Sequence, residues 1–535
     1  MSASKKNTFF GGAAILTAGV IIVKIIGAIY KIPLFNILGK TGFGHFSVAY
    51  TIFNVLLTIS TAGLPVALSK TISEANTLGK QNQVQKVFRT SLFAFLTLGT
   101  LSFLFMFFGS GMLANLQNDS GAQFAIAALA PCVLFVCTMS AFRGYAQGHG
   151  DMVPTTISQI IEASLKLVVG LAIAGFVVAT LSNDDPTRKL ELAAGGAIIG
   201  VTTGSFVALI YLILRYLRHR SEDPAGRGDD VADSSGTILS NLVKIAIPIT
   251  LGSSAVSIVN LIDTNLTLGR LQSAVGLSEE AAVGLYGTYQ SALTLYNLPA
   301  AFMIPLTAAI IPAVAAAIAK RDHLAASRIS ESALRMASLV ALPMGIGLTA
   351  LSGPIIGLLY PTADVEVAGP LLATLGIASI FVCIMLICNS ILQAHGYVNL
   401  PILTTLIGGI IMPSVNYVLV GNPKIGIQGA PIGTLCCFAT VAILDMFIIH
   451  RVIPTPPSFV RALGKPALAA VLMGIAAWAS CLLFTALGLG RLAVLLGIGV
   501  GGLLYVVLVL VLKVFSKEDL ALMPKGDKIA KFLRL

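Results

Sequence analysis

Long apolar stretches alternate with short polar segments along the whole chain of 535 residues. Each stretch has about 20 residues or more, the length that a helix needs to cross a hydrocarbon core of roughly 30 Å. The pattern therefore predicts an all-α polytopic membrane protein. We expect about fourteen transmembrane helices, at residues 9–37, 43–69, 87–113, 121–146, 153–181, 190–217, 238–268, 284–318, 330–352, 367–393, 398–420, 427–449, 462–486 and 490–514.

The composition excludes a soluble globular protein, since 56% of residues are hydrophobic, 11% are charged and the mean hydropathy is +0.91. All seven cysteines lie in apolar segments without metal-ligand spacing, so we expect no disulfide and no metal site. The net charge of +11 comes from basic residues at helix ends, which argues against nucleic acid as a partner. The first apolar run lacks a small-residue cleavage site, so we expect it to stay in the protein.

The loops between the predicted helices differ in basic charge. With the N-terminus in the cytoplasm, only six of the 34 Lys and Arg residues fall on the external side. Cytoplasmic loops carry the excess of Lys and Arg in membrane proteins. The charge distribution therefore predicts a multi-pass membrane protein with both termini in the cytoplasm (N-in and C-in).

An internal repeat divides the chain. FVCTMSAFRGYAQGHG at 135–150 aligns without gaps to FVCIMLICNSILQAHG at 381–396, with seven identities in sixteen positions. A repeat of six helices preserves topology, so we expect two parallel lobes with a central site between them. The predicted parts are an N-terminal six-helix lobe at 1–217, a cytoplasmic linker at 218–237, a C-terminal six-helix lobe at 238–450, helices 13 and 14 at 451–514, and a basic cytoplasmic tail at 515–535.

Two lysines interrupt the first apolar run. Lys24 lies about 15 residues into the helix, or roughly 22 Å deep, whereas Lys31 lies near the far interface, where its ammonium can snorkel beside Tyr30. A lysine at the depth of Lys24 costs about 3 kcal/mol unless it faces a polar cavity or a partner. Lys24 is therefore a candidate for a functional cavity, with a silent buried pair as the alternative.

Polar residues near mid-membrane occupy related places in the two halves. Asn54 and Asn297 are equivalent in the repeat, and they either line a shared cavity or only hydrogen-bond neighbouring helices. Asn260 is the repeat mate of Lys24. Asp263, one turn further on, is a candidate for charge pairing or proton coupling, or else an interfacial Asp bonded to its own helix end.

A further charged pair and two turns complete the candidates. Glu162 and Lys166 are spaced i,i+4 and are expected to form a structural ion pair on one helix face, with a role in coupling as the alternative. Matching Q-x-H-G turns end the fourth and tenth helices, where Gly permits the turn and a nearby Pro begins the next helix. We expect helical hairpins there, with a secondary role in a cytoplasmic gate, formed by Arg143, Gln147, His149, Gln393 and His395.

Several segments together resemble a known family. They are KIIGAIYKIPLFNILG at 24–39, AGLPVALSKTISEA at 62–75, RGYAQGHGDMVPTTISQIIE at 143–162 and LQAHGYVNLPILTTLIGG at 392–409. They are similar to the stage V sporulation protein B branch of the polysaccharide transporters, in the MOP superfamily. This branch is related to MurJ-type lipid II flippases and, more distantly, to MATE-type drug exporters.

The resemblance implies two six-helix lobes around a central cavity that opens alternately to each side of the membrane. In MurJ-type flippases, basic residues of the first, second and eighth helices face the lipid pyrophosphate, and the last two helices form a groove for the polyprenyl tail. Lys24 matches the first basic position. The second basic position of the first helix matches Tyr30, and Lys31 lies one residue later. The basic position of the second helix matches Leu57, and the predicted eighth helix contains no basic residue.

The expected function is therefore an alternating-access flippase for an undecaprenyl-pyrophosphate-linked saccharide, with lipid II as the leading substrate. Exporters of another polysaccharide repeat unit, such as teichoic acid or exopolysaccharide, and MATE-type cation-coupled drug exporters are the alternatives. The short external loops argue against a membrane glycosyltransferase or acyltransferase, so no enzyme activity is expected. We expect a monomer among membrane lipids, with no cofactor, driven by the membrane potential or by Na⁺ or H⁺.

Overall fold

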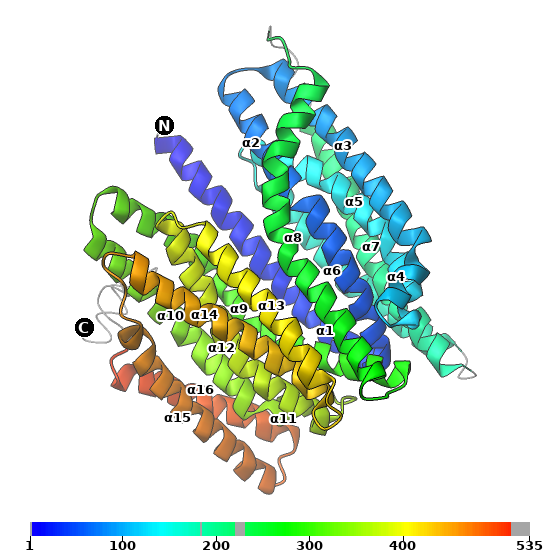
Figure 1. Ribbon diagram of the computed structural model, residues 1–535, viewed down its shortest axis with the longest axis vertical. Helices are drawn as coiled ribbons and strands as arrows, with labels where there is room; N and C mark the ends of the chain where they lie inside the picture. Colours follow the sequence, from blue (N-terminus) through cyan, green and yellow to red (C-terminus); the bar gives the residue numbers. More distant parts are fainter. Residues whose placement is uncertain (1–2, 182–184, 220–229, 515–535) are drawn as a thin grey trace. The chain divides into compact units, whose positions relative to one another are not determined.

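Helices account for nearly all regular structure in this computed structural model, which describes residues 3–181, 185–219 and 230–514 (Figure 1). No strand occurs in these ranges. Twelve helices are long and apolar enough to cross a membrane, or thirteen if α8, Ser235–Ser273, bent by 45°, is counted as one span. The fold class predicted from the sequence is confirmed. Most of the predicted linker, 220–229, and the predicted basic tail, 515–535, lie outside the described residues.

Helix α1, Ala3–Thr61, contains the first two predicted spans. A straight helix of 59 residues would be roughly 88 Å long, far more than a bilayer is thick. Gly39 interrupts it with φ 65° and ψ −177°, a conformation open almost only to glycine. The chain doubles back there, because Tyr30 and Phe46 on either side pack with ring centroids 6.1 Å apart (Figure 1). Counting α1 as two spans brings the number to the expected fourteen.

Residues 1–287 form the first of two compact units. Small residues let its helices approach closely: a Cβ on Gly200 of α7 would lie 2.2 Å from the backbone nitrogen of Gly170 on α6. Besides α1 and α8, this unit contains α2 (Gly63–Thr77), α3 (Gln81–Phe108), α4 (Ser110–Leu116), η1 (Ser120–Ala122), α5 (Gln123–Gly148), α6 (Val153–Thr180) and α7 (Pro186–His219).

The segment before α8 is fastened to the start of α3. The Asp230 carboxylate accepts hydrogen bonds from the backbone N–H groups of Asn82 and Gln83, both at 2.9 Å. Gln83 also donates to Asp233 at 2.8 Å and accepts from the Asp233 backbone N–H at 2.7 Å. Desolvation raises the pKa of Asp230, but the backbone donors together outweigh it and hold this pKa below its ordinary value. A carboxylate 148 residues away thus caps α3, whose own N-cap residue, Lys80, supplies no side-chain cap.

The second compact unit, residues 288–535, begins inside α9, Glu279–Ala319. Its buried core joins α9, α10, α12, α14 and α15. The lobe boundary at 218–237 stays a prediction, since it rests on internal repetition rather than on compactness. The unit contains α10 (His323–Ala350), α11 (Ser352–Leu359), α12 (Val365–Ala394), α13 (Asn399–Val420), η2 (Gly426–Gln428), α14 (Gly429–Val452), α15 (Phe459–Ala486) and α16 (Arg491–Val511).

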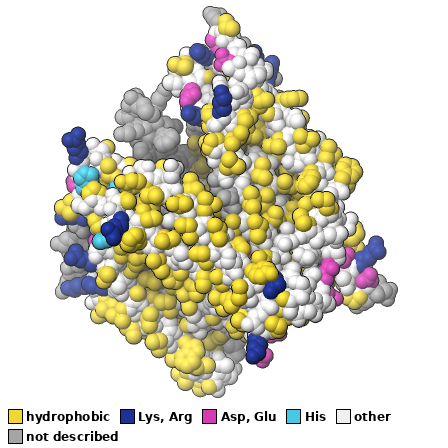
Figure 2. Space-filling model, in the orientation of Figure 1, with side chains coloured by type: hydrophobic (Ala, Val, Ile, Leu, Met, Phe, Trp, Pro, Cys, Tyr) yellow, Lys and Arg dark blue, Asp and Glu magenta, His cyan; other side chains and the backbone are white. Residues whose placement is uncertain are grey.

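Large hydrophobic side chains are exposed on helices of both units, for example Phe93 of α3, 72% exposed, and Leu503 of α16, 72% exposed. Figure 2 shows hydrophobic side chains over much of the visible surface, with charged ones mainly toward its margins. Such a surface would be unstable in water but fits a lipid environment. The chain is a multi-pass membrane protein.

Candidate functional site

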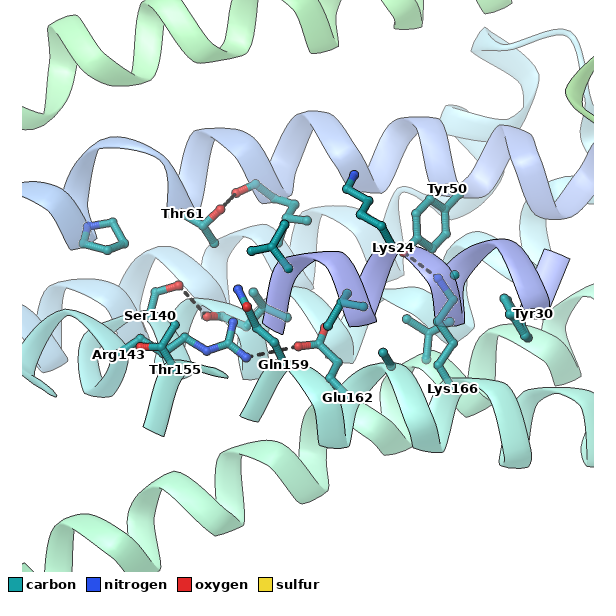
Figure 3. Close-up of a pocket in the computed structure, with 18 of the residues that line it drawn as sticks. Lys24, Tyr30, Tyr50, Thr61, Ser140, Arg143, Thr155, Gln159, Glu162 and Lys166 are labelled. Atoms are coloured by element: carbon teal, nitrogen blue, oxygen red, sulfur yellow. Dashed lines mark hydrogen bonds and ion pairs between the residues drawn. The ribbon is translucent and has the colours of Figure 1, made fainter. Parts of the chain in front are cut away.

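A cavity of about 510 Å³ lies within the first unit, between α1, α2, α5, α6 and α7. The doubling back of α1 matters here, because residues from both of its halves line the cavity. Apolar side chains and glycine form part of the wall, and Figure 3 shows the polar residues that line the rest, with Arg143 directed at Glu162 and Lys166 at Tyr50. The polar lining residues are Lys24, Tyr30, Tyr50, Thr61, Ser140, Arg143, Gln147, Thr155, Gln159, Glu162 and Lys166.

The Glu162 carboxylate is held by two other helices. Arg143 of α5 places its Nη2 atom 3.2 Å from Glu162 Oε2, and Ser205 of α7 donates to Oε1 at 3.2 Å. Arg143 is oriented in turn by Ser158, which accepts a 2.9 Å hydrogen bond from its Nε. Figure 3 shows this pair on one wall of the cavity. Both charges are thereby paired, and pairing lowers the free-energy cost of placing them inside a membrane-spanning segment.

Lys166 lies between two aromatic rings of α1. Its Nζ donates to the Tyr50 hydroxyl at 3.0 Å and lies 4.5 Å from the Tyr50 ring centroid and 5.0 Å from that of Tyr30. The expected i,i+4 ion pair between Glu162 and Lys166 is therefore wrong. Arg143 satisfies the carboxylate, and cation–π contacts stabilise the ammonium instead.

Lys24 faces the cavity from the first half of α1, and its side chain is exposed there (Figure 3). It forms no ion pair or hydrogen bond with the part of the chain that the structure describes, so a silent buried pair is not what holds it. Three cations, Lys24, Arg143 and Lys166, therefore line the cavity against one carboxylate, Glu162. The cavity carries an excess of two positive charges.

The other predicted cavity residues are scattered. Tyr30 lines the cavity, and its buried hydroxyl donates to the Ala197 carbonyl of α7 at 3.3 Å. Asn297 is in the second unit and donates to the Leu293 carbonyl of its own helix at 2.7 Å. The residues outside the cavity lining are Lys31 and Asn54, both half-buried, Asn260, exposed, and Asp263, buried.

The two Q-x-H-G turns have the same local structure in both units. His149 Nδ1 lies 2.9 Å from the Tyr145 carbonyl, and His395 Nδ1 lies 2.8 Å from the Ile391 carbonyl, so each ring contacts the last turn of its own helix. The glycines that follow them have φ of 82° and 88°. The predicted helical hairpins are confirmed, while a role in gating stays a prediction.

Of the expected gate residues, Arg143 and Gln147 belong to the cavity, where Gln147 donates to Thr155 at 3.2 Å, while Gln393 is exposed in the second unit. The sequence did not lead to a prediction of Arg143 and Lys166 as cavity cations. Both residues lie inside apolar spans, and this position alone marks a charged residue as a candidate for a polar cavity. Within the described ranges, no group of three His, Cys, Asp or Glu could hold a metal ion.

A second cavity, about 290 Å³, lies within the second unit between α9, α10, α11, α15 and α16, and we call it the apolar groove. Its lining is entirely apolar: Leu298, Pro343, Met344, Gly347, Leu348, Leu351, Ile355, Met473, Ala477, Ile498, Gly501 and Gly502. Trp478, the single tryptophan of the chain, is the neighbour of Ala477 on α15 and is 54% exposed. Helices α15 and α16 thus form one side of the groove.

The described helices form a polytopic membrane fold, and three cations and one carboxylate line the cavity in its first unit. Two solved structures share the fold: "Lipid II flippase MurJ, inward closed conformation", with TM-score 0.71, 14% identity and coverage of 93% of this chain and 98% of that one, and an inward-facing multidrug resistance MATE family transporter, with TM-score 0.66, 15% identity and coverage of 82% and 98%.

The chain belongs to the family described as "Polysaccharide biosynthesis protein", which matches residues 9–318. Relatives in Bacillus subtilis (strain 168) include an uncharacterized membrane protein, YabM, which is 25% identical over 99% of this chain and 97% of its own length. Stage V sporulation protein B is 23% identical, with coverage of 97% and 98%. Lipid II flippase MurJ is 23% identical, with coverage of 76% and 77%. MurJ is named a flippase, and the two solved structures are titled as a flippase and a multidrug resistance transporter.

Proposed function

We propose that this protein is an alternating-access flippase that moves an undecaprenyl-pyrophosphate-linked saccharide, with lipid II as the leading substrate, from the inner to the outer leaflet. On this proposal it is monomeric in the bacterial cytoplasmic membrane with both termini in the cytoplasm. It needs no cofactor and catalyses no covalent step. The likeness to stage V sporulation protein B and MurJ supports the class of substrate.

The excess of positive charge in the cavity carries the proposal. Lys24 faces the cavity without a partner among the described residues, and Lys166 is held by tyrosines rather than by a carboxylate. A diphosphate bridge between a lipid and a sugar carries an ionised oxygen on each phosphorus and would neutralise both lysines. Such charge-assisted contacts strengthen where water is excluded.

The same charge count argues against a MATE-type exporter of cationic drugs. Glu162 is the carboxylate of the cavity, and Arg143 and Ser205 already contact it. A cationic drug would have to displace Arg143 and to lie near Lys24 and Lys166, so like charges would repel it.

The experiment that tests the proposal is binding to the purified protein in nanodiscs. We expect lipid II, or undecaprenyl pyrophosphate alone, to bind and a lipophilic cation such as ethidium not to compete. Expression in a strain depleted of its lipid II flippase should restore growth. Binding of undecaprenyl pyrophosphate without rescue would shift the substrate to another repeat unit, such as a teichoic acid or exopolysaccharide precursor. Binding of the cation alone would refute the proposal.

The apolar groove is the site we propose for the polyprenyl tail, and it allows a matched pair of variants. A side chain at Gly502 would enter open space in the groove, since nothing lies within 4 Å of a Cβ built there. Gly499 is equally open but does not line the groove. We expect Gly502→Phe to lower lipid II transport at least tenfold and Gly499→Phe to leave it unchanged, with equal expression, in a proteoliposome flipping assay. Equal transport by both variants would exclude the groove.

A further inference from the structure

A buried histidine and a buried aspartate lie near the bend of α1, and neither residue lines the cavity. His45 is 4% exposed and Asp119 is fully buried, and His45 Nδ1 lies 2.6 Å from Asp119 Oδ1. His45 belongs to the second half of α1. Asp119 belongs to the connection from α4 to α5, and we call residues 116–122, which include the end of α4 and all of η1, the Asp119 loop. Nothing in the cavity described above uses this pair.

Each member of the pair keeps one buried atom without a partner in the described part of the chain: His45 Nε2 and Asp119 Oδ2. Nε2 is the nitrogen that gains or loses a proton while Nδ1 stays engaged with the carboxylate. A Cβ on Gly121 would lie 2.4 Å from His45 Cε1 and 2.8 Å from Nε2, so the loop packs directly on the ring and only glycine fits there. The ring and the loop are therefore in direct contact.

The Asp119 loop also holds two other helices. Ser120, the next residue, contacts Glu279 Oε1 at the start of α9 through its backbone nitrogen at 2.5 Å and its hydroxyl at 2.6 Å. The Asn118 carbonyl accepts a 2.7 Å hydrogen bond from Gln272 of α8, and the Leu116 carbonyl accepts one from Asn265. Figure 1 shows that the bend of α1, α4 and this end of α8 lie at the end of the unit opposite the N-terminus.

The surroundings of His45 are acidic. Besides Asp119, Glu191 of α7 and Glu279 of α9 act on the ring electrostatically, and Arg188 lies beside Glu191. The positive charge of a protonated imidazole neutralises the negative charge of the Asp119 carboxylate. A neutral imidazole leaves a buried negative charge facing two more carboxylates, which is unfavourable in a low-dielectric site. Histidine is the side chain whose ordinary titration falls in the physiological range.

We propose that the His45–Asp119 pair is a proton-binding site that locks this end of the first unit. With the proton bound, the Asp119 loop stays packed against α8 and α9. When the proton leaves, the buried carboxylate gains free energy by reaching water, so the loop withdraws and the ends of α8 and α9 separate from it. Coupling of this release to substrate movement rests on the proposed function, whereas the lock itself does not.

Distance measurements between two spin labels test the lock without any substrate. Labels at Met112→Cys of α4 and Ser273→Cys of α8 sit on exposed positions, whereas six of the seven native cysteines are buried and the seventh half-buried. In otherwise unaltered protein we expect one short distance at pH 5.5 and a growing population of longer distances by pH 8. A distribution that does not change with pH would overturn the proposal.

Variants distinguish proton binding at the His45–Asp119 pair from the contact between Ser120 and Glu279 that holds the loop to α9. His45→Gln should abolish the pH dependence, and His395→Gln, the same change at a ring that contacts only its own helix in the described contacts, should preserve it. Glu279→Ala removes the exposed acceptor of Ser120 and should show the longer distances at both pH values. If His45→Gln does not fold, Asp119→Asn replaces it with the same expected result. A pH shift that survives in the His45→Gln or Asp119→Asn protein would refute proton binding at this pair.

The lock and the proposed function can fail separately. Undecaprenyl pyrophosphate binding to the same nanodiscs reports on the substrate, and the label distances report on the proton. A pH-dependent distance without lipid binding would support the proton site and reject the flippase. Lipid binding with a distance that does not change with pH would support the flippase and reject the proton site.

Discussion

At the scale of single residues, charge at depth is the most informative signal in this sequence. Lys24 was recognisable because a lysine about 15 residues into an apolar run has a cost that something must offset. The partner of Glu162 was not recognisable. Local i,i+4 spacing favours Lys166 as the partner of Glu162. The observed partner, Arg143, lies on the preceding helix, and only the packing of the two helices brings Arg143 and Glu162 together.

The first prediction concerns Lys24. Loss of one charge-assisted contact costs about 1.5–3 kcal/mol, so Lys24→Ala should bind undecaprenyl pyrophosphate roughly tenfold to a hundredfold more weakly. Lys24→Arg should retain much of the binding, and Lys24→Glu should bind none because a carboxylate repels the diphosphate. Expression should stay normal, because no ion partner among the described residues is left stranded. The measurement is lipid binding in nanodiscs.

Lys70→Ala is the control for this series, since Lys70 is an exposed lysine paired with Glu74 on the surface of α2. It should bind as the unaltered protein does. Full binding by Lys24→Ala, with normal expression, would remove Lys24 from the substrate site. Poor expression of Lys24→Ala would instead point to a structural role.

At the scale of elements, hydropathy predicts spans well because the requirement for about 20 apolar residues is local. It does not show how two spans are joined. The first two spans form a hairpin at Gly39, a residue that the sequence analysis did not single out, since nothing in the local pattern distinguishes it from the helical glycines nearby. The cavity depends on this hairpin, because Lys24 and Tyr50 come from its two halves.

We therefore predict that Gly39→Ala destabilises the protein by about 1–3 kcal/mol, because the backbone conformation at Gly39 excludes a Cβ. The melting temperature in detergent measures the effect. Gly175→Ala is the matched control: Gly175 lies within helix α6 with nothing within 4 Å of a Cβ, so it should be neutral or slightly stabilising. Equal melting temperatures for the two variants would contradict the role of Gly39.

At the scale of the whole molecule, the internal repeat and the asymmetry of basic charge predict an orientation that can be tested in cells. Asp185, between α6 and α7, should face outward, and Leu78, 69% exposed between α2 and α3, should face the cytoplasm. Asp185→Cys should react with an impermeant maleimide added to intact cells, and Leu78→Cys only after permeabilisation. The reverse pattern would invert the topology.

The apolar groove has an optical consequence. The single tryptophan of the chain, Trp478, follows the groove residue Ala477 in the sequence and is 54% exposed. Lipids brominated along the acyl chain should quench its fluorescence, and a polyprenyl chain that enters the groove should change this quenching in proportion to occupancy. Gly502→Phe should abolish the change. A fluorescence change of equal size in Gly502→Phe would show that the polyprenyl chain binds elsewhere. If the variant shows no change, the fluorescence of Trp478 reports substrate binding in the native protein without an attached dye.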